Sequence, residues 1–254
     1  MAVDDLAAQN KRLCSLILGA SFGLVAIVLA LLALLDGLGL IGVVVALVVA
    51  GAVTAGAWWA APGLVIRMSG AQPVGRDAEA RLHNLLDGLC AANGVAKPTL
   101  HLIDDPAVNA FAAGRMAEHA SIAVTRGLLD HMSRVELEAV LAHTLSLIKN
   151  DDILVDSLAV TSPVGARLVH RARPRTREPW ADLTAVEMTR YPPALAAALA
   201  KMRDADTAIA VSPRLMAHLW IADPTGGPPG GPTEVRRFDD HPTLEERIAA
   251  LQEL

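Results

Sequence analysis

The residues whose types and spacing could do chemistry are concentrated in one stretch, His143-Thr144-Leu145-Ser146-Leu147. In a helical His-Glu-x-x-His motif the two imidazoles lie one turn apart and bind one Zn²⁺, and the glutamate activates the zinc-bound water. His143 keeps the first of these positions. Thr144 stands at the general-base position, where its hydroxyl cannot take a proton near neutral pH. Leu147 stands at the second ligand position and has no donor atom.

His143 therefore has two interpretations. A lone histidine on an apolar helix is usually a core residue whose polar atoms are satisfied within the fold. The other interpretation is a ligand that survives from a zinc site. Because a catalytic zinc normally has three protein ligands, the second interpretation depends on what other donors the fold brings to His143.

The helix that must carry these residues is predicted over residues 133–151. Ser133 followed three residues later by Glu136 is a capping box, which marks the start of a helix. Asn150-Asp151-Asp152 predicts a break or polar turn at its end. The apolar face between these signals consists of Leu137, Val140, Leu141, Leu145 and Ile148.

Two apolar runs at the start of the chain predict a transmembrane hairpin over residues 1–66. The runs 13–35 and 38–61 contain no charged residue, and each is long enough to span the apolar core of a bilayer. Asp36-Gly37 is the only link between them, so the two helices must be antiparallel. A signal peptide would have a shorter apolar region and would not be followed at once by a second span.

Basic residues flank both runs on the same side. Lys11 and Arg12 precede the first span, Arg67 and Arg76 follow the second, and the tip contains neither lysine nor arginine. The positive-inside rule then predicts a multi-pass protein of the plasma membrane with both termini and the globular domain in the cytoplasm. The lipid bilayer is its first expected partner.

The apolar patterns of residues 67–254 predict a mainly helical domain with a small β-sheet, which is an α+β fold. Alternating patterns predict strands at 98–103, 109–114 and 121–125. Helices are expected at 76–93, 181–190 and 193–203 and after the capping box at Thr243. The segment 153–169 is too interrupted to span a membrane and should be packed or interfacial, and residues 223–233 form a flexible Gly/Pro-rich loop.

Composition narrows the functional classes. The chain has 254 residues, of which 53% are hydrophobic and 19% charged, which is typical of a membrane protein with a globular part. The net charge of −5 gives no sign of nucleic-acid binding. Cys14 and Cys90 show neither metal-ligand spacing nor a disulfide framework. The arginines in residues 167–177 predict either a solvated loop or contact with anionic headgroups.

Several segments, taken in order, resemble the HtpX-like membrane zinc metallopeptidases, which are related to the CAAX prenyl proteases. The residues VELEAVLAHTLSLIKNDDILV are similar to the active-site helix of that family, which reads roughly ELEAVLAHELSHIKNRDIL. The hairpin, the segments 109–112, 125–129 and 178–199, and the segment 241–248 also resemble their counterparts. The resemblance implies a zincin-like domain and covers almost the whole chain.

The resemblance also implies roles for single residues. His143 and Glu178 match zinc ligands, and Leu147 matches a ligand that is lost. Thr144 matches the catalytic glutamate. Asp182 matches the aspartate of the family's ExxAD motif, which can orient a ligand histidine, so we expect it within hydrogen-bonding distance of His143.

Two further expectations concern an edge strand, which the resemblance implies, and the conformation at Glu178, which the following proline restricts. The residues Asn109, Ala110, Phe111 and Ala112 match an edge strand that can hold an extended substrate by strand addition. Pro179 disfavours a helical conformation at the preceding residue, so Glu178 should lie at or before a helix start.

These residues predict a membrane-anchored pseudopeptidase without catalytic residues and without a cofactor. It would bind unfolded peptides or act as a regulatory or structural partner of a membrane complex, in the inner membrane of a bacterium. The alternative is an active zinc metalloendopeptidase in membrane-protein quality control, with ligands that the spacing of the histidines does not identify. A third interpretation is a structural subunit without a peptide groove. Zinc is expected only under the second.

Overall fold

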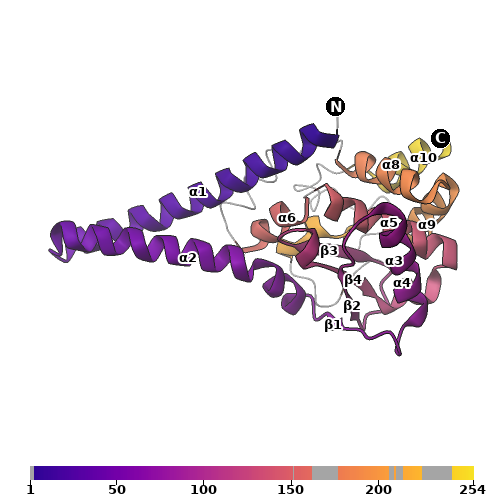
Figure 1. Ribbon diagram of the computed structural model, residues 1–254, viewed down its shortest axis with the longest axis horizontal. Coiled ribbons are helices and arrows are strands. Elements are labelled where there is room, and N and C mark those ends of the chain that lie inside the picture. Colours follow the sequence, from indigo (N-terminus) through magenta and orange to yellow (C-terminus); the bar gives the residue numbers. More distant parts are fainter. Residues whose placement is uncertain (1–2, 151, 162–176, 206–208, 210–213, 225–241) are drawn as a thin grey trace.

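Two long helices form the start of the chain. The computed structural model describes residues 3–150, 152–161, 177–205, 209, 214–224 and 242–254. Helices α1 (Val3–Leu35) and α2 (Gly39–Met68) lie side by side and project from one end of the molecule (Figure 1). Only 17% of the most apolar window of either helix is buried, so these are not core helices of a soluble domain. Both are long and apolar enough to cross a bilayer.

The helices extend beyond the apolar runs from which they were predicted. Helix α1 includes the polar residues before Leu13, and α2 continues through Pro62. At the tip, Gly37 and Gly39 have φ values of 75° and 57°, a backbone region that favours glycine. The predicted hairpin is therefore formed. The last turns of α2 pack against the globular domain.

A four-stranded mixed sheet forms the centre of the domain. Its order is β1 (Gln72–Pro73), β2 (Thr99–Ile103), β4 (Ala120–Thr125) and β3 (Ala110–Gly114). Strands β2 and β4 are parallel, and β3 pairs antiparallel with β4. The 3₁₀ turn η1 (Ala117–His119) joins β3 to β4.

Helix α5 (Arg134–Lys149) is packed between the sheet and several other helices. It contacts β3, α3 (Ala80–Asn93), α8 (Arg177–Thr189) and α9 (Pro192–Asp204). Nearly all of its residues from Glu136 to Ile148 are buried. Ser133 and Glu136 form the predicted capping box, and Asn150 is the C-cap. The predicted helix is confirmed, apart from residue 151, which lies outside the described residues.

Helix α6 (Asp152–Thr161) packs the hairpin onto the domain. It contacts α1, α2 and β3, and Figure 1 shows it beside the end of α2 and the sheet. Leu158 and Ala159 form a cluster with Ile17 of α1 and Ala61 of α2. The described part of the segment 153–169 is therefore packed, as predicted.

The smaller elements complete an α+β fold. Helix α4 (Arg126–His131) follows β4, and α10 (Leu244–Gln252) begins at the predicted Thr243 capping box. The 3₁₀ helix η2 (Arg214–Leu219) precedes Trp220, which forms an isolated bridge with Phe111 of β3. Of the predicted Gly/Pro loop, only Asp223 and Pro224 lie within the described residues.

Candidate functional site

The site forms where α5 and α8 pack together. On α8 the buried residues Glu178, Ala181, Asp182 and Ala185 recur at the helical spacing and form one face toward α5. Ser146 on α5 connects the two helices, because its hydroxyl donates to the carbonyl oxygens of His143 (2.7 Å) and Ala181 (3.1 Å). This packing brings the two acidic residues of α8 to the imidazole of His143.

Asp182 lies against one side of the His143 ring. The distance from Nδ1 of His143 to Oδ1 of Asp182 is 2.8 Å, and the His143 side chain is fully buried. This distance is short enough for a direct polar contact between the carboxylate and the ring nitrogen. The predicted proximity of these two residues is confirmed.

Glu178 lies on the other side of the same ring. Its Oε2 is 3.5 Å from Nε2 of His143. Two ligands that share a tetrahedral zinc at 2.0–2.2 Å would lie about 3.3–3.6 Å apart. Glu178 lies in the first described turn of α8, and Pro179 follows within that turn, where a proline is tolerated. Glu178 was predicted at or before a helix start. It lies in the first turn of α8 and is itself helical.

Arg247 of α10 completes the buried cluster. Its Nε and Nη2 each donate to Asp182 at 2.7 Å, a bidentate pairing, and Nη1 donates to the carbonyl of Ile221 at 3.1 Å. Nη1 is also 3.7 Å from Glu178. The guanidinium group therefore places one buried positive charge beside both carboxylates, paired closely with Asp182 and more distantly with Glu178.

The charges of the cluster shift the pKa of its members in opposite directions. Burial is the largest influence and favours the neutral ring, but Asp182 and Glu178 outweigh it and raise the pKa of His143. Burial also opposes ionisation of Glu178, yet His143, Arg177 and Arg247 hold its pKa well below the usual range. Asp182 has a lowered pKa for the same reason, with Arg247 as the main opposing charge. Both carboxylates are therefore ionised at neutral pH.

The two altered positions of the motif supply no chemistry. The hydroxyl of Thr144 donates to the helix carbonyl of Leu141 at 2.9 Å, with a longer contact to Val140 at 3.3 Å. Thr144 is fully buried, and Leu147 belongs to the main apolar core. Position 144 thus bonds to its own helix, and position 147 contributes only hydrocarbon.

The donors of this cluster do not fit a catalytic zinc. His143 and Glu178 are two candidate ligands, one fewer than a catalytic site requires. Among the described residues, no group of three or more His, Cys, Asp and Glu side chains could hold a metal ion. Of the other histidines, His170 and His241 lie outside that part of the chain.

A second set of buried charges connects this cluster to the hairpin. Arg177 donates to Glu178 at 3.1 Å and to Asp156 at 2.5 Å, and its Nε is 3.3 Å from Asp152. Asp152 in turn accepts a hydrogen bond of 2.8 Å from Asn10 of α1. A chain of polar contacts therefore runs from α1 to the candidate site.

Arg177 was predicted to belong to a solvated or lipid-contacting arginine stretch, and that prediction is wrong for this residue. It is 7% exposed and pairs with three carboxylates. The other arginines of the stretch 167–177 lie outside the described residues. The signal for a buried partner was the acidic pair Asp152 and Asp156 within an apolar segment, because buried carboxylates need a cation.

Arg247 was also missed as a site residue. It lies in the segment 241–248, which the sequence singles out without assigning it a charge partner. The capping box at Thr243 sets the helical phase that places Arg247 on the same buried face as Ile248 and Leu251. A lone arginine on the apolar face that Ile248 and Leu251 form was the available signal.

The predicted substrate edge is paired within the chain. Strand β3 is at the edge of the sheet, but Phe111 forms an antiparallel bridge with Trp220, and the N–H of Ile221 donates to Ala110 O at 3.1 Å. The side chain of Asn109 bonds both backbone groups of Ala222, at 2.8 and 3.2 Å. A peptide could not add to residues 109–111 in this conformation. Ala112, the last residue of the predicted groove, is buried on the same strand.

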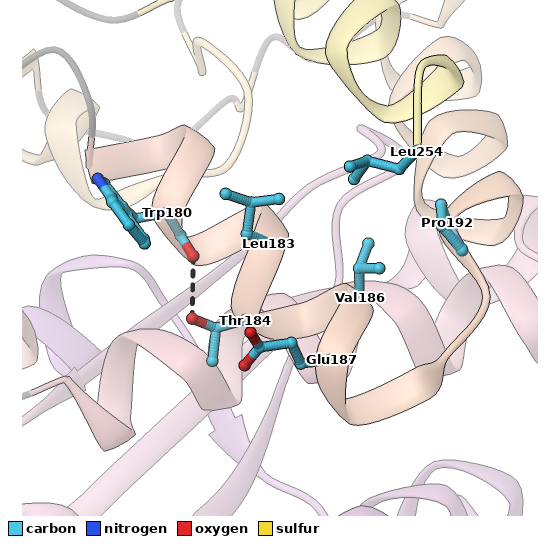
Figure 2. A pocket seen from close by; sticks show the side chains of 7 residues that line it. All are labelled: Trp180, Leu183, Thr184, Val186, Glu187, Pro192 and Leu254. Atoms are coloured by element: carbon cyan, nitrogen blue, oxygen red, sulfur yellow. Dashed lines mark hydrogen bonds between the residues drawn. The ribbon is translucent and has the colours of Figure 1, made fainter. Parts of the chain in front are cut away.

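A shallow pocket lies on the other side of α8 and is separate from His143. It is lined by Trp180, Leu183, Thr184, Val186, Glu187, Pro192 and Leu254 (Figure 2). Thr184 donates to the carbonyl of Trp180 at 2.9 Å, which ties its hydroxyl to the helix. Glu187 is the only ionisable side chain among the lining residues, so the lining contains no pair of ionisable side chains that could act as acid and base.

Comparison with known proteins identifies the family. Residues 76–254 match the family described as Peptidase family M48. A protease HtpX homolog of Tropheryma whipplei (strain Twist) is 35% identical over 231 residues, covering 75% of this chain and 78% of that protein. The homolog of Salinibacter ruber is 32% identical over 268 residues (91% and 95% covered), and that of Aquifex aeolicus 31% over 262 residues (85% of each).

Proposed function

Because the chain belongs to peptidase family M48 and is an HtpX-like membrane protein, we propose that it is a membrane-anchored pseudopeptidase. It keeps the scaffold of a zinc endopeptidase and lacks the residues for hydrolysis. Its role is that of a regulatory or structural partner in a membrane-protein complex. It needs no cofactor and binds no nucleic acid.

The state of the motif on α5 carries this proposal. His143, Glu178 and Asp182 are held together, so the packing that once served a metal is retained. Thr144 has its hydroxyl bonded to the helix carbonyl of Leu141, and Leu147 is part of the core. A general base and one ligand are therefore lacking in an otherwise intact arrangement, and hydrolysis by activated water requires both.

The edge of the sheet favours a protein partner over free-standing peptide binding. Strand addition uses an unpaired row of backbone groups, and at Ala110 this row is already bonded to Ile221. Binding of an unfolded peptide there would require displacement of the segment 220–222. The hairpin, by contrast, exposes long apolar surfaces in the plane of the bilayer, where a membrane protein can pack.

The hairpin gives the proposed topology. Both α1 and α2 cross the plasma membrane, and the globular domain lies on the cytoplasmic side. Lys11, Arg12 and Arg67 support this orientation, since the tip at Asp36-Gly37 has no basic residue. In right-side-out membrane vesicles an added protease should leave the domain intact, and in inverted vesicles it should digest it. Digestion in right-side-out vesicles alone would reverse the orientation.

Metal analysis of the detergent-purified protein tests the central claim. We expect substoichiometric zinc and no chelator-sensitive cleavage of casein. Stoichiometric zinc together with casein cleavage that a chelator abolishes would replace the proposal with an active endopeptidase that uses other ligands. Co-purification of a defined membrane protein from solubilised membranes supports the partner role.

A further inference from the structure

Two tryptophans mark one boundary of the proposed membrane span. Trp58 and Trp59 are adjacent in α2, and their rings meet edge to face with centroids 6.5 Å apart. At 1.5 Å per residue, the part of α2 from Gly39 to Trp58 is about 29 Å long, which matches a bilayer core of about 30 Å. Indole side chains favour the boundary between that core and the headgroups.

The positions at which α1 and α2 become buried in the domain place the membrane boundary at the level of the two tryptophans. Beyond the tryptophans α2 enters the domain, where Ala61 and Val65 are fully buried. On α1 the corresponding residue is Ile17, which is 1% exposed. Between Ile17 and Leu35 α1 is about 27 Å long, so the two helices leave the apolar core at similar heights.

The turn that joins β3 to β4 contacts this tryptophan pair. The guanidinium carbon of Arg115 is 3.9 Å from the ring centre of Trp59 and 5.4 Å from that of Trp58, which are cation–π distances. Trp59 is nevertheless 67% exposed, so its remaining surface is available to lipid.

The direction of β3 explains why the turn reaches the tryptophans. Phe111, near the start of β3, packs in the same cluster as Val65, and Arg115, just after the strand, packs on Trp59. The strand and the end of α2 therefore run alongside each other, and β3 points back toward the bilayer. Met116, the next residue, is 43% exposed.

We propose that the turn 115–119 is a second membrane contact, which lies in the interfacial zone of the bilayer at the level of Trp58 and Trp59. Met116 inserts its apolar side chain at the boundary, and Arg115 remains on the indoles. Together with the hairpin, this contact fixes the orientation of the domain on the membrane surface. This inference rests on the proposed membrane-spanning hairpin.

The partner is the interfacial zone of a phospholipid bilayer irrespective of headgroup charge. Arg115 and Glu118 carry opposite charges within the turn, and the Arg115 guanidinium is already engaged by two rings. Attraction to anionic lipid is therefore a small part of the contact, and burial of Met116 and Trp59 is the larger part.

Spin labels at three positions of the full-length protein in nanodiscs test this inference. Met116→Cys reports on the turn, Val44→Cys reports on the membrane-spanning part of the hairpin, and Ala92→Cys on α3 is the matched aqueous control. Val44 is 52% exposed and Ala92 is exposed. The native Cys14 and Cys90 are buried, and the unsubstituted protein gives the labelling background.

The measurement is the ratio of accessibility to oxygen, which partitions into lipid, over accessibility to a water-soluble nickel chelate. We expect the highest ratio at position 44, the lowest at 92 and an intermediate ratio at 116. Adding Arg115→Glu to the Met116→Cys protein should lower the ratio at 116. The ratio should be the same in phosphatidylcholine discs and in discs that contain phosphatidylglycerol.

The outcomes separate this inference from the topology on which it rests. A ratio at 116 equal to that at 92, with a high ratio at 44, would overturn the membrane contact of the turn and leave the hairpin in place. A low ratio at 44 would overturn the membrane-spanning hairpin itself. A ratio at 116 that rises only with phosphatidylglycerol would overturn the indole-based contact in favour of simple charge attraction.

Discussion

Asp182 contacts both Arg247 and His143, and the buried cluster depends on it. Its carboxylate accepts two hydrogen bonds of 2.7 Å from Arg247 and lies 2.8 Å from His143. All three side chains are almost completely buried. Because a buried charge without its partner is costly, these three residues stabilise the packing of α5, α8 and α10.

Asp182→Asn should strongly destabilise the domain. The change leaves the Arg247 guanidinium buried with a weakened counter-charge, and loss of one member of a buried pair costs about 3–5 kcal/mol. Chemical denaturation in detergent measures the difference. Glu187→Gln, on the exposed side of the same helix, is the control and should change stability by less than about 0.5 kcal/mol. Equal stabilities of the two variants would show that the cluster is not structural.

The double substitution Thr144→Glu/Leu147→His should restore stoichiometric zinc. His143 Nε2 and Glu178 Oε2 are 3.5 Å apart, a spacing that two ligands of one zinc can have, and a histidine at position 147 adds the third. Thr144→Glu alone is the control and should not bind zinc stoichiometrically. If the double variant purifies without metal, the spacing of His143 and Glu178 does not represent a retained half-site.

At the scale of elements, α5 is fixed at its first turn and by close packing around it. Glu136 accepts from the backbone N–H of Ser133 at 2.7 Å and pairs with Lys201 of α9 at 2.7 Å. Gly127, just upstream in α4, packs directly against the backbone of the 106–107 segment. These contacts set the position of α5, and therefore of His143, relative to the sheet.

Glu136→Gln should lower stability by about 1 kcal/mol at neutral pH, through weakening of the capping box and the Lys201 pair. Burial is the largest influence on the Glu136 carboxyl and raises its pKa, but Lys201 and Ser133 together lower the pKa below 4.5. With a folded pKa below the unfolded one, the stabilisation is present above pH 4.5 and is lost as the pH falls through the folded pKa.

The difference between the two proteins should therefore shrink below pH 4.5. Denaturant melts of both proteins at a series of pH values measure it. A difference that is constant between neutral and strongly acidic pH would contradict the ionic contribution of Glu136.

Gly127→Ala should destabilise the domain severely, whereas Gly88→Ala should not. An added Cβ at Gly127 would lie 1.9 Å from the carbonyl oxygen of Pro106, so backbone must move, at a cost of about 1–3 kcal/mol or more. At Gly88 in α3 nothing lies within 4 Å, and alanine should add about 0.5–1 kcal/mol of stability. Thermal unfolding compares the pair, and similar melting temperatures would contradict the close approach at Gly127.

On the scale of the whole molecule, α6 determines how the membrane hairpin and the domain move together. Its apolar face packs against α1 and α2, and its Asp152 bonds Asn10 of α1. Through Arg177 the same acidic residue is connected to Glu178 and the candidate site. Anything that shifts the hairpin, such as a membrane partner, therefore has a direct path of contacts to α8.

Leu158→Ala should loosen the hairpin from the domain. Leu158 is 1% exposed where α1, α2 and α6 meet, and loss of a buried leucine side chain costs about 2–5 kcal/mol. Limited proteolysis in detergent should cleave the variant faster than the parent protein within residues 150–161. Leu183→Ala, at a position that is 37% exposed, is the control. Unchanged cleavage within α6 would indicate that the junction does not depend on this contact.

The sequence by itself determined the elements whose signals are local. Apolar length predicted the hairpin, the Ser133 and Thr243 capping boxes predicted α5 and α10, and alternation predicted β2, β3 and β4. The match of Asp182 to a motif predicted its contact with His143. Each of these signals depends on a few neighbouring positions or on an ordered motif, so the residue types are sufficient to identify it.

Only the tertiary structure decided which charges meet and which surfaces are already occupied. Arg247 and Asp182 are 65 residues apart. In the sequence Arg177 cannot be distinguished from the neighbouring arginines, and only the packing of α6 shows that it pairs with Asp156. The pairing of residues 220–222 with β3 and the contact of Arg115 with the tryptophans also join segments that are far apart in sequence. Such contacts depend on how helices and strands pack. Local periodicity does not identify the partner of a buried charge or the segment that pairs with the edge of a sheet.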